Sequence, residues 1–212
     1  MDEKRERRQM LLIYVAIGVI VAVITGWFLY QNRMEFWETQ ARSAFRMALG
    51  EELQKRNEVD VYFSSSGNIR LPDNSIDIKK EPIKVRIESE YGVKDFFIPY
   101  EKHSHNIERS SDMRASYSYV LYKSPLQADS LNRIWYRLLE EMNYFGKTVV
   151  RISVADWDER ETYTFSDDSL YMLKPDSLMS CYLGYRCEIG VTGYLYYSWL
   201  NVFTVKDKIL LC

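Results

Sequence analysis

One segment near the amino terminus restricts the fold more than any other part of the sequence. It runs from Met10 to Tyr30 and contains no charged residue. A helix of this length spans roughly 30 Å at about 1.5 Å per residue, which is the thickness of the hydrocarbon core of a bilayer. It ends in an aromatic stretch around Trp27 and Phe28, which is typical of a membrane interface and unlike a signal-peptide cleavage site. We therefore expect an uncleaved transmembrane helix over residues 10–30.

The charges on either side of this segment predict its orientation. Residues 1–9 carry four basic side chains, whereas the basic residues that follow Tyr30 are spread thinly. The positive-inside rule then makes residues 1–9 a cytoplasmic leader. It locates the chain in the cytoplasmic (inner) membrane, with residues 31–212 on the extracytoplasmic side. The lipid bilayer is thus the first expected partner.

Small residues recur along one side of the expected transmembrane helix. Gly18, Ala22 and Gly26 follow one another at four-residue steps, a spacing that lets two membrane helices approach closely. The pattern makes these residues candidate helix contacts in a homodimer. Glycine and alanine are also common in membrane helices in general, so the same spacing arises without any dimer.

Residues 31–57 are predicted to continue as a juxtamembrane helix, because apolar residues recur at steps of three and four. These residues are Trp37, Ala41, Ala44, Phe45, Ala48, Leu49 and Leu53. A helix joined directly to a membrane span can pass movement between an outer domain and the membrane. It can equally serve only to pack against its own domain.

The first half of residues 58–212 predicts short strands and one loop. Strands are expected at "VDVYF", "PIKVRIES" and "KDFFIPY", where β-branched and aromatic residues lie between turn signals. Residues 101–114 are polar and are expected to form an exposed loop. A further strand is expected at "ASYSYVLYK", whose tyrosines alternate.

The second half predicts a central helix and four antiparallel strands. The helix should begin near Asp129, with Asp129 or Ser130 as N-cap and Gly146 just beyond its end. The strands are expected at "TVVRISVAD", with Val150, Ile152 and Val154 facing inward, then at "ETYTF", "CYLGYRCEI" and "YLYYSWLNVF", the last two joined by a "GVTG" turn. The predicted fold class is α+β: a membrane helix and juxtamembrane helix, then an antiparallel sheet with the central helix packed on one face.

Composition and motifs exclude several functions. The net charge of −2 gives no basic field for nucleic acid. No Ser/His/Asp arrangement, phosphate-binding glycine loop or metal-hydrolase helix is present, so we expect neither an enzyme nor a cofactor.

Two pairs of residues carry side chains that could form a disulfide or bind a metal. Cys181 and Cys187 alternate on one predicted strand, where about 20 Å would separate them, so buried free thiols are favoured over a disulfide. Only a tight hairpin centred on Gly184 would bring them together. His103 and His105 form a His-x-His pair, but two ligands in a polar loop fall short of a metal site.

An acidic group surrounds the predicted turn at "WDER". It comprises Asp156, Asp158, Glu159 and Glu161, with Asp167 and Asp168 further along the chain. The run lacks the glycine and the final glutamate of a calcium loop at the proper spacing. A charged hairpin tip is therefore favoured.

Three segments of the outer region resemble bacterial membrane-bound sensor proteins. They are "SPLQADSLNRIWYRLL", "GKTVVRISVAD" and "GYRCEIGVTGY". In such proteins one span leads to an outer sensing domain, a second span and a cytoplasmic output module. The output is a histidine kinase in two-component systems or a winged-helix transcription regulator. The resemblance implies a signal-transduction sensor with an unidentified ligand, although this chain lacks the second span and the output module.

The sequence thus leaves two functional hypotheses. The first is the extracytoplasmic sensor region of a single-pass membrane receptor that binds a small-molecule or protein ligand. The second is an envelope scaffold that recruits partners without catalysis. The terminal "VKDKILLC", in which charged residues precede apolar ones, favours the first hypothesis because it is typical of the start of a second span.

Overall fold

The computed structural model of the chain describes residues 3–56, 81–89, 92–144, 146–167 and 173–197. The chain divides into two compact units, of which one is Met1–Arg42 with Tyr197–Cys212 and the other is Ser43–Tyr196. The predicted strand at "VDVYF" and the terminal "VKDKILLC" lie outside the described residues.

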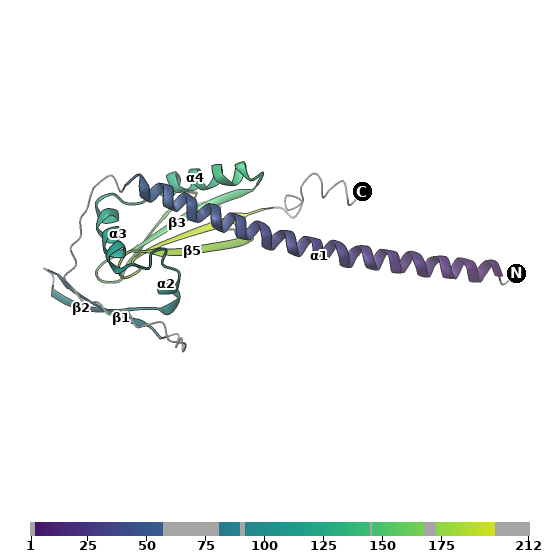
Figure 1. The fold of residues 1–212 in the computed structure, drawn as a ribbon, viewed down its shortest axis with the longest axis horizontal. Coiled ribbons are helices and arrows are strands. Elements are labelled where there is room, and N and C mark those ends of the chain that lie inside the picture. The colour runs from purple at the N-terminus through teal and green to yellow at the C-terminus, as the bar shows by residue number, and fades with distance from the viewer. Residues whose placement is uncertain (1–2, 57–80, 90–91, 145, 168–172, 198–212) are drawn as a thin grey trace. The chain divides into compact units, whose positions relative to one another are not determined.

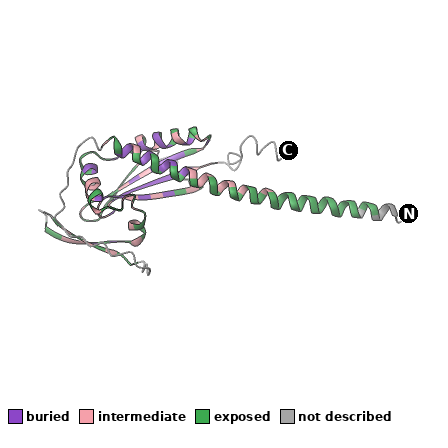
Figure 2. Cartoon of the chain, viewed as in Figure 1, coloured by how far each residue is buried: buried purple, intermediate pink, exposed green. Residues whose placement is uncertain are grey.

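A single long helix, α1, covers Glu3–Gln54 (Figure 1). Its apolar residues between Met10 and Leu29 are largely exposed, as Figure 2 shows. The helix is long and apolar enough to cross a membrane. Water would hydrate such a surface at high free-energy cost, so α1 is compatible with a single-pass membrane protein and a membrane anchor.

Four antiparallel strands form the main sheet of the Ser43–Tyr196 unit. They are β3 (Lys147–Ala155), β4 (Glu161–Phe165), β5 (Ser177–Leu183) and β6 (Ile189–Tyr196). The order across the sheet is β4-β3-β6-β5, so β6 is central and pairs on both sides. Four final antiparallel strands were predicted, and the α+β class with antiparallel sheets is confirmed.

The core of this unit lies where α1 and α4 (Ala128–Glu141) meet β6. Phe45 of α1 and Trp135 of α4 are almost fully buried, and their rings contact edge to face with centroids 4.9 Å apart. Both rings lie against Gly193 of β6. A glycine at this point of the strand lets two aromatic rings approach the backbone.

A second, two-stranded ladder consists of β1 (Ile83–Ser89) and β2 (Gly92–Ile98). Phe96 of β2 is buried against Trp157 in the turn between β3 and β4, with ring centroids 5.2 Å apart. The guanidinium of Arg186, from the turn between β5 and β6, lies 4.6 Å from the centre of the Phe96 ring. The ladder is thereby attached to two turns of the main sheet.

The segment between the two sheets is helical, contrary to the predicted loop and strand. It forms α2 (Tyr100–Ser104) and α3 (Ser111–Lys123). The hydroxyl of Ser110 accepts a hydrogen bond from the Met113 N–H and caps α3. The alternating tyrosines of "ASYSYVLYK" suggested a strand, but a helix buries Arg114 and Leu121, seven residues apart, on one side. Capping and burial outweigh the period-2 pattern.

The last hairpin was predicted in the wrong place. The segment "CYLGYRCEI" is not one strand, because β5 ends at Leu183 and the chain turns through residues 184–188. Gly184 and Cys187 have φ angles of +89° and +58°, in the left-handed region that tight turns use. The "GVTG" segment, expected to turn, lies instead within β6 and is buried.

The ends of the central helix also differ from the prediction. Its N-cap is Gln127, without a side-chain hydrogen bond, so neither Asp129 nor Ser130 caps it. Its end is marked by Asn143, which has a φ of +60°, and not by Gly146. In β3, Val150 and Ile152 are buried as expected, whereas Val154 is 41% exposed.

Candidate functional site

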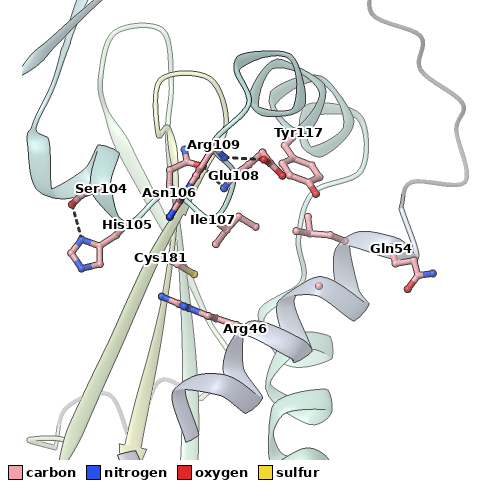
Figure 3. A pocket seen from close by; sticks show the side chains of 12 residues that line it. Arg46, Gln54, Ser104, His105, Asn106, Ile107, Glu108, Arg109, Tyr117 and Cys181 are labelled. Carbon is pink, nitrogen blue, oxygen red and sulfur yellow. Dashed lines mark hydrogen bonds between the residues drawn. The ribbon is translucent and has the colours of Figure 1, made fainter. Parts of the chain in front are cut away.

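A cavity of about 550 Å³ lies in the Ser43–Tyr196 unit, within the range of small-molecule sites. The last turns of α1, the connection between α2 and α3, α3 itself and β5 all contribute to its lining (Figure 3). The lining residues are Arg46, Gly50, Leu53, Gln54, Ser104, His105, Asn106, Ile107, Glu108, Arg109, Tyr117 and Cys181.

The connection between α2 and α3 is fixed to the edge of the main sheet. The N–H of Ile107 donates to the Tyr182 carbonyl over 3.0 Å, and the N–H of Tyr182 donates to the His105 carbonyl over 3.0 Å. These bonds form a short parallel bridge between Asn106 and Tyr182. A wall of the cavity is thus positioned by the backbone of β5.

Asn106 ties the same wall to the turn between β5 and β6. Its Nδ2 donates to the Gly184 carbonyl over 3.1 Å and to the Cys187 sulfur over 3.3 Å. Its Oδ1 accepts from the Glu108 N–H over 3.0 Å. The Asn106 side chain is therefore engaged in the fold, and its role in the cavity is to shape it.

Glu108 is also engaged with the backbone of the two residues that follow it. Its Oε1 accepts from the N–H groups of Arg109 and Ser110, over 2.8 and 3.2 Å. Its carbonyl accepts from Nε of the buried Arg114 over 2.6 Å. Burial raises the pKa of the half-buried Tyr117 phenol, and the negative charge of Glu108 raises it further. Tyr117 therefore remains a neutral phenol that can donate a hydrogen bond.

Two arginines bring positive charge to the cavity from different elements. Arg46 comes from α1 and Arg109 from the α2–α3 connection, and both are exposed. Within the described part of the chain, neither guanidinium makes an ion pair or a hydrogen bond. Their five N–H donors each remain available to water or to a ligand.

Cys181 lies at the cavity as a buried thiol. Burial raises its pKa to about 12, against a smaller opposing effect of the Arg46 charge. Burial also raises the pKa of Cys187, although the Asn106 hydrogen bond and nearby cations oppose this. Both cysteines are free in the structure. Thiols that stay protonated are poor nucleophiles, so neither has the environment of a reactive cysteine.

The end of α1 that lines the cavity is held by a buried carboxylate. Glu52 is 1% exposed and accepts a hydrogen bond from Ser130 of α4 over 3.0 Å. It also pairs with Arg56, whose Nη1 lies 2.8 Å from Oε1. Arg56 in turn donates to the carbonyls of Ser124 and Pro125, over 3.1 Å each. These contacts fasten the end of α1 to α4 and the segment before it.

Of the two histidines, only His105 belongs to the cavity. His105 lines the cavity and its Nδ1 lies 2.8 Å from the Glu101 carbonyl oxygen, whereas the pKa of His103 is lowered by burial and by the Arg114 charge. Gly18 and Ala22 are exposed on α1, and Gly26 is half-buried.

The acidic group around "WDER" forms part of a hairpin turn. Oδ1 of Asp156 accepts from the N–H groups of Asp158 and Arg160, over 2.8 and 2.9 Å. Glu161 pairs with Lys102 over 3.0 Å. In the described ranges, no group of three His, Cys, Asp or Glu side chains is arranged to hold a metal ion.

The cavity itself was not predicted, because half of its lining residues fall in the segment expected to be an exposed loop. One feature of the sequence could have indicated it. Ser110 and Asp112 are a helix-start signal, and a helix there turns Tyr117 toward the preceding residues. Comparison with protein-family models, with curated proteins and with solved structures found no match to this chain.

Proposed function

We propose that the chain is the extracytoplasmic sensor region of a single-pass membrane receptor. In this proposal residues 10–30 are the membrane anchor, residues 31–57 are the juxtamembrane helix, and α4 is the central helix on one face of the sheet. The observation that carries the proposal is the continuity of α1, which contains both the apolar segment and the cavity residues Arg46, Gly50 and Gln54. A ligand in the cavity would therefore contact the same helix that enters the membrane.

Ligand binding transmits a signal only if it favours one of two helix arrangements. The ligand can shift that equilibrium by no more than its difference in affinity for the two. A change from 1:99 to 99:1 requires about 5.5 kcal/mol of differential binding. The cavity contacts on α1 are the groups through which such a difference would arise.

Several expectations belong to the same proposal. The amino terminus is cytoplasmic, the membrane is the inner membrane, and Gly18, Ala22 and Gly26 form the seam of a homodimer. The output is of the two-component or transcription-regulating kind, which the resemblance to bacterial sensors supports. The region itself performs no catalysis and binds no nucleic acid, in line with its motifs and its charge.

A substitution that fills the cavity tests the coupling without any ligand. A Cβ added at Gly50 meets nothing within 4 Å, so Gly50→Trp can project its ring into the cavity. Met47→Trp is the matched control, because Met47 is 49% exposed on the same helix and does not line the cavity. Both variants would be made in the full chain in lipid nanodiscs.

The measurement is amide hydrogen exchange over residues 31–42, which lie about two helical turns or more from Gly50. We expect Gly50→Trp to change exchange rates there at least threefold, and Met47→Trp to leave them unchanged. A response confined to the turns around the substitution, in both variants, would reject the sensor in favour of a scaffold.

The scaffold has one observation of its own, since Val93 and Phe97 of β2 are more than 60% exposed and could contact a partner.

Orientation is tested separately. A reporter enzyme that is active only outside the cytoplasm can be fused after residue 212. We expect this fusion to be active, because the proposal puts residue 212 on the extracytoplasmic side. Activity of a cytoplasmic reporter at the same position would contradict the proposed topology.

A further inference from the structure

The cavity is richer in free hydrogen-bond donors than in free acceptors. Two of its acceptors are already used, because Oδ1 of Asn106 and Oε1 of Glu108 accept backbone N–H groups, whereas Oε2 of Glu108 accepts none from the described residues. Nδ2 of Asn106 is used as well. The remaining polar groups include the guanidiniums of Arg46 and Arg109, for which the described residues offer no partner.

Two neutral donors accompany the arginines. The Tyr117 hydroxyl and the Gln54 amide line the same cavity and make no hydrogen bond with the part of the chain that the structure describes. Leu53 and Ile107 add apolar surface, with the buried Cys181 thiol beside them. A few convergent polar groups on an apolar lining are typical of a small-molecule site.

The charge of the lining is also positive. Arg46 and Arg109 contribute two positive charges, against the single negative charge of Glu108, whose Oε1 is already engaged with backbone donors. Arginine differs from lysine in that its planar fork can donate two parallel hydrogen bonds to one carboxylate or phosphate group.

We propose that this cavity binds a small organic anion, and that Arg46 and Arg109 pair with its carboxylate or phosphate oxygens. Tyr117 and Gln54 donate to further oxygens of the same ligand, and Leu53 and Ile107 contact its carbon skeleton. The inference rests on the proposed sensor function and names the ligand class of that sensor. Because Arg46 belongs to α1, the anion would bridge α1 and the α2–α3 connection.

The test uses the full chain in phosphatidylcholine nanodiscs at 150 mM salt, titrated calorimetrically with two anions and their neutral counterparts. The probes are succinate with succinamide, and glycerol phosphate with glycerol. We expect saturable binding of at least one anion at low millimolar concentration or better, and none of its neutral counterpart. Succinate alone would identify a carboxylate ligand, and glycerol phosphate alone a phosphate ligand.

Four variants assign the binding to the two arginines. Arg46→Ala and Arg109→Ala should each weaken it at least tenfold, and Arg46→Lys, which keeps the charge but loses the fork, should weaken it two- to fivefold. Arg133→Ala is the matched control, because Arg133 is an exposed arginine of α4 that does not line the cavity. Since both cavity arginines are exposed, their removal should leave the circular dichroism spectrum unchanged.

Either of two results would overturn the proposal. One is the absence of saturable binding by both anions up to 20 mM, and the other is equal weakening by Arg133→Ala. Neither bears on the Gly50→Trp experiment, which uses no ligand. A failed anion test with intact coupling would thus reject the ligand class alone, whereas failed coupling would reject the sensor.

Discussion

Gly193 offers the sharpest test of how α1 is joined to its domain. A Cβ built on Gly193 would lie 2.9 Å from Cε2 of Phe45 and 2.9 and 3.0 Å from two ring carbons of Trp135. Carbon atoms prefer about 3.5–4.0 Å, so Gly193→Ala creates an overlap of roughly 0.5–1 Å. Both rings are almost fully buried and cannot swing away. Nor can the strand shift sideways, since β6 is paired on both edges.

The magnitude follows from two opposing effects. Overpacking a well-filled core typically destabilises by about 1–3 kcal/mol. Replacing glycine in a strand restores roughly 0.5–1 kcal/mol, because alanine has less backbone freedom to lose on folding. We therefore expect Gly193→Ala to lower the free energy of unfolding by about 1–2 kcal/mol.

The same substitution at Gly50 is the matched control. Gly50 lies on an exposed face of α1, and a Cβ there meets nothing within 4 Å. Alanine is favoured over glycine in a helix by about 1 kcal/mol, so Gly50→Ala should stabilise the protein. Two chemically identical changes are thus expected to act with opposite signs.

The assay is urea unfolding of the full chain in detergent micelles, followed by tryptophan fluorescence and checked for an unchanged dependence on urea concentration. Phe45→Leu, which removes the ring edge, should recover part of the loss when combined with Gly193→Ala, because neighbouring changes are not additive. A Gly193→Ala protein as stable as the parent would refute the close packing of the two rings on β6. So would a double variant in which the two losses simply add.

Three further predictions concern buried or half-buried groups. Glu52→Ala leaves Arg56 without its carboxylate and should lower the free energy of unfolding by about 3 kcal/mol, whereas Glu51→Gln, which breaks an exposed ion pair, should change it by less than 1 kcal/mol. Urea unfolding measures both. Asn106→Ala leaves the Glu108 N–H without its acceptor and leaves the Gly184 carbonyl with only the Cys187 N–H as donor; it should cost about 1–3 kcal/mol and increase amide exchange at residues 105–108. Because the pKa of Cys181 is raised to about 12 in the folded protein, its thiol loses the proton at a lower pH in the unfolded chain than in the folded one. The free energy of unfolding should therefore fall as the pH rises from about 9 toward 12. The fall should be shallower in Cys181→Ala, and equal slopes would contradict the burial of this thiol.

Glycine shows why the sequence predicted the class of the last hairpin but not its position. The segment from Gly184 to Gly193 contains glycines that have different structural roles, and the sequence alone does not distinguish these roles. Gly184 has a positive φ and makes the turn, whereas Gly193 lies in a strand and makes room for two rings. Only the partners across the core distinguish these uses, and those partners lie far away in the chain.

The helix α3 was predicted as a loop and a strand because of a local pattern, whereas its tertiary contacts favour a helix. Its tyrosines alternate, but Arg114 is buried and donates to the Glu108 carbonyl, and Ser118 accepts from the Tyr185 N–H over 2.7 Å. The second of these bonds joins α3 to the turn between β5 and β6. A prediction that placed this turn elsewhere could not supply it. The cavity was missed for the same reason, because its walls exist only once α3 and the turn are in place.

The long helix was predicted more fully, since hydrophobicity and periodicity are local properties. They identified the apolar segment and the buried residues Phe45 and Leu49, but gave no indication that α1 also lines a cavity.

The two sides of α1 in the Ser43–Tyr196 unit bear on how a ligand could act. One side is fixed to the core through Phe45 and Glu52, and the other presents Arg46 and Gly50 to the cavity. The contacts of the fixed side are each expected to contribute a few kcal/mol, which is at least as much as the 1–3 kcal/mol that typically couples two sites. A ligand that binds Arg46 would therefore not break the contacts between the end of α1 and the core. It would instead have to move the helix together with the residues packed on it, as a rigid element with two arrangements. This favours a response that reaches the distant residues 31–42 over one that dissipates around the cavity, which is the outcome that the exchange measurement on Gly50→Trp distinguishes.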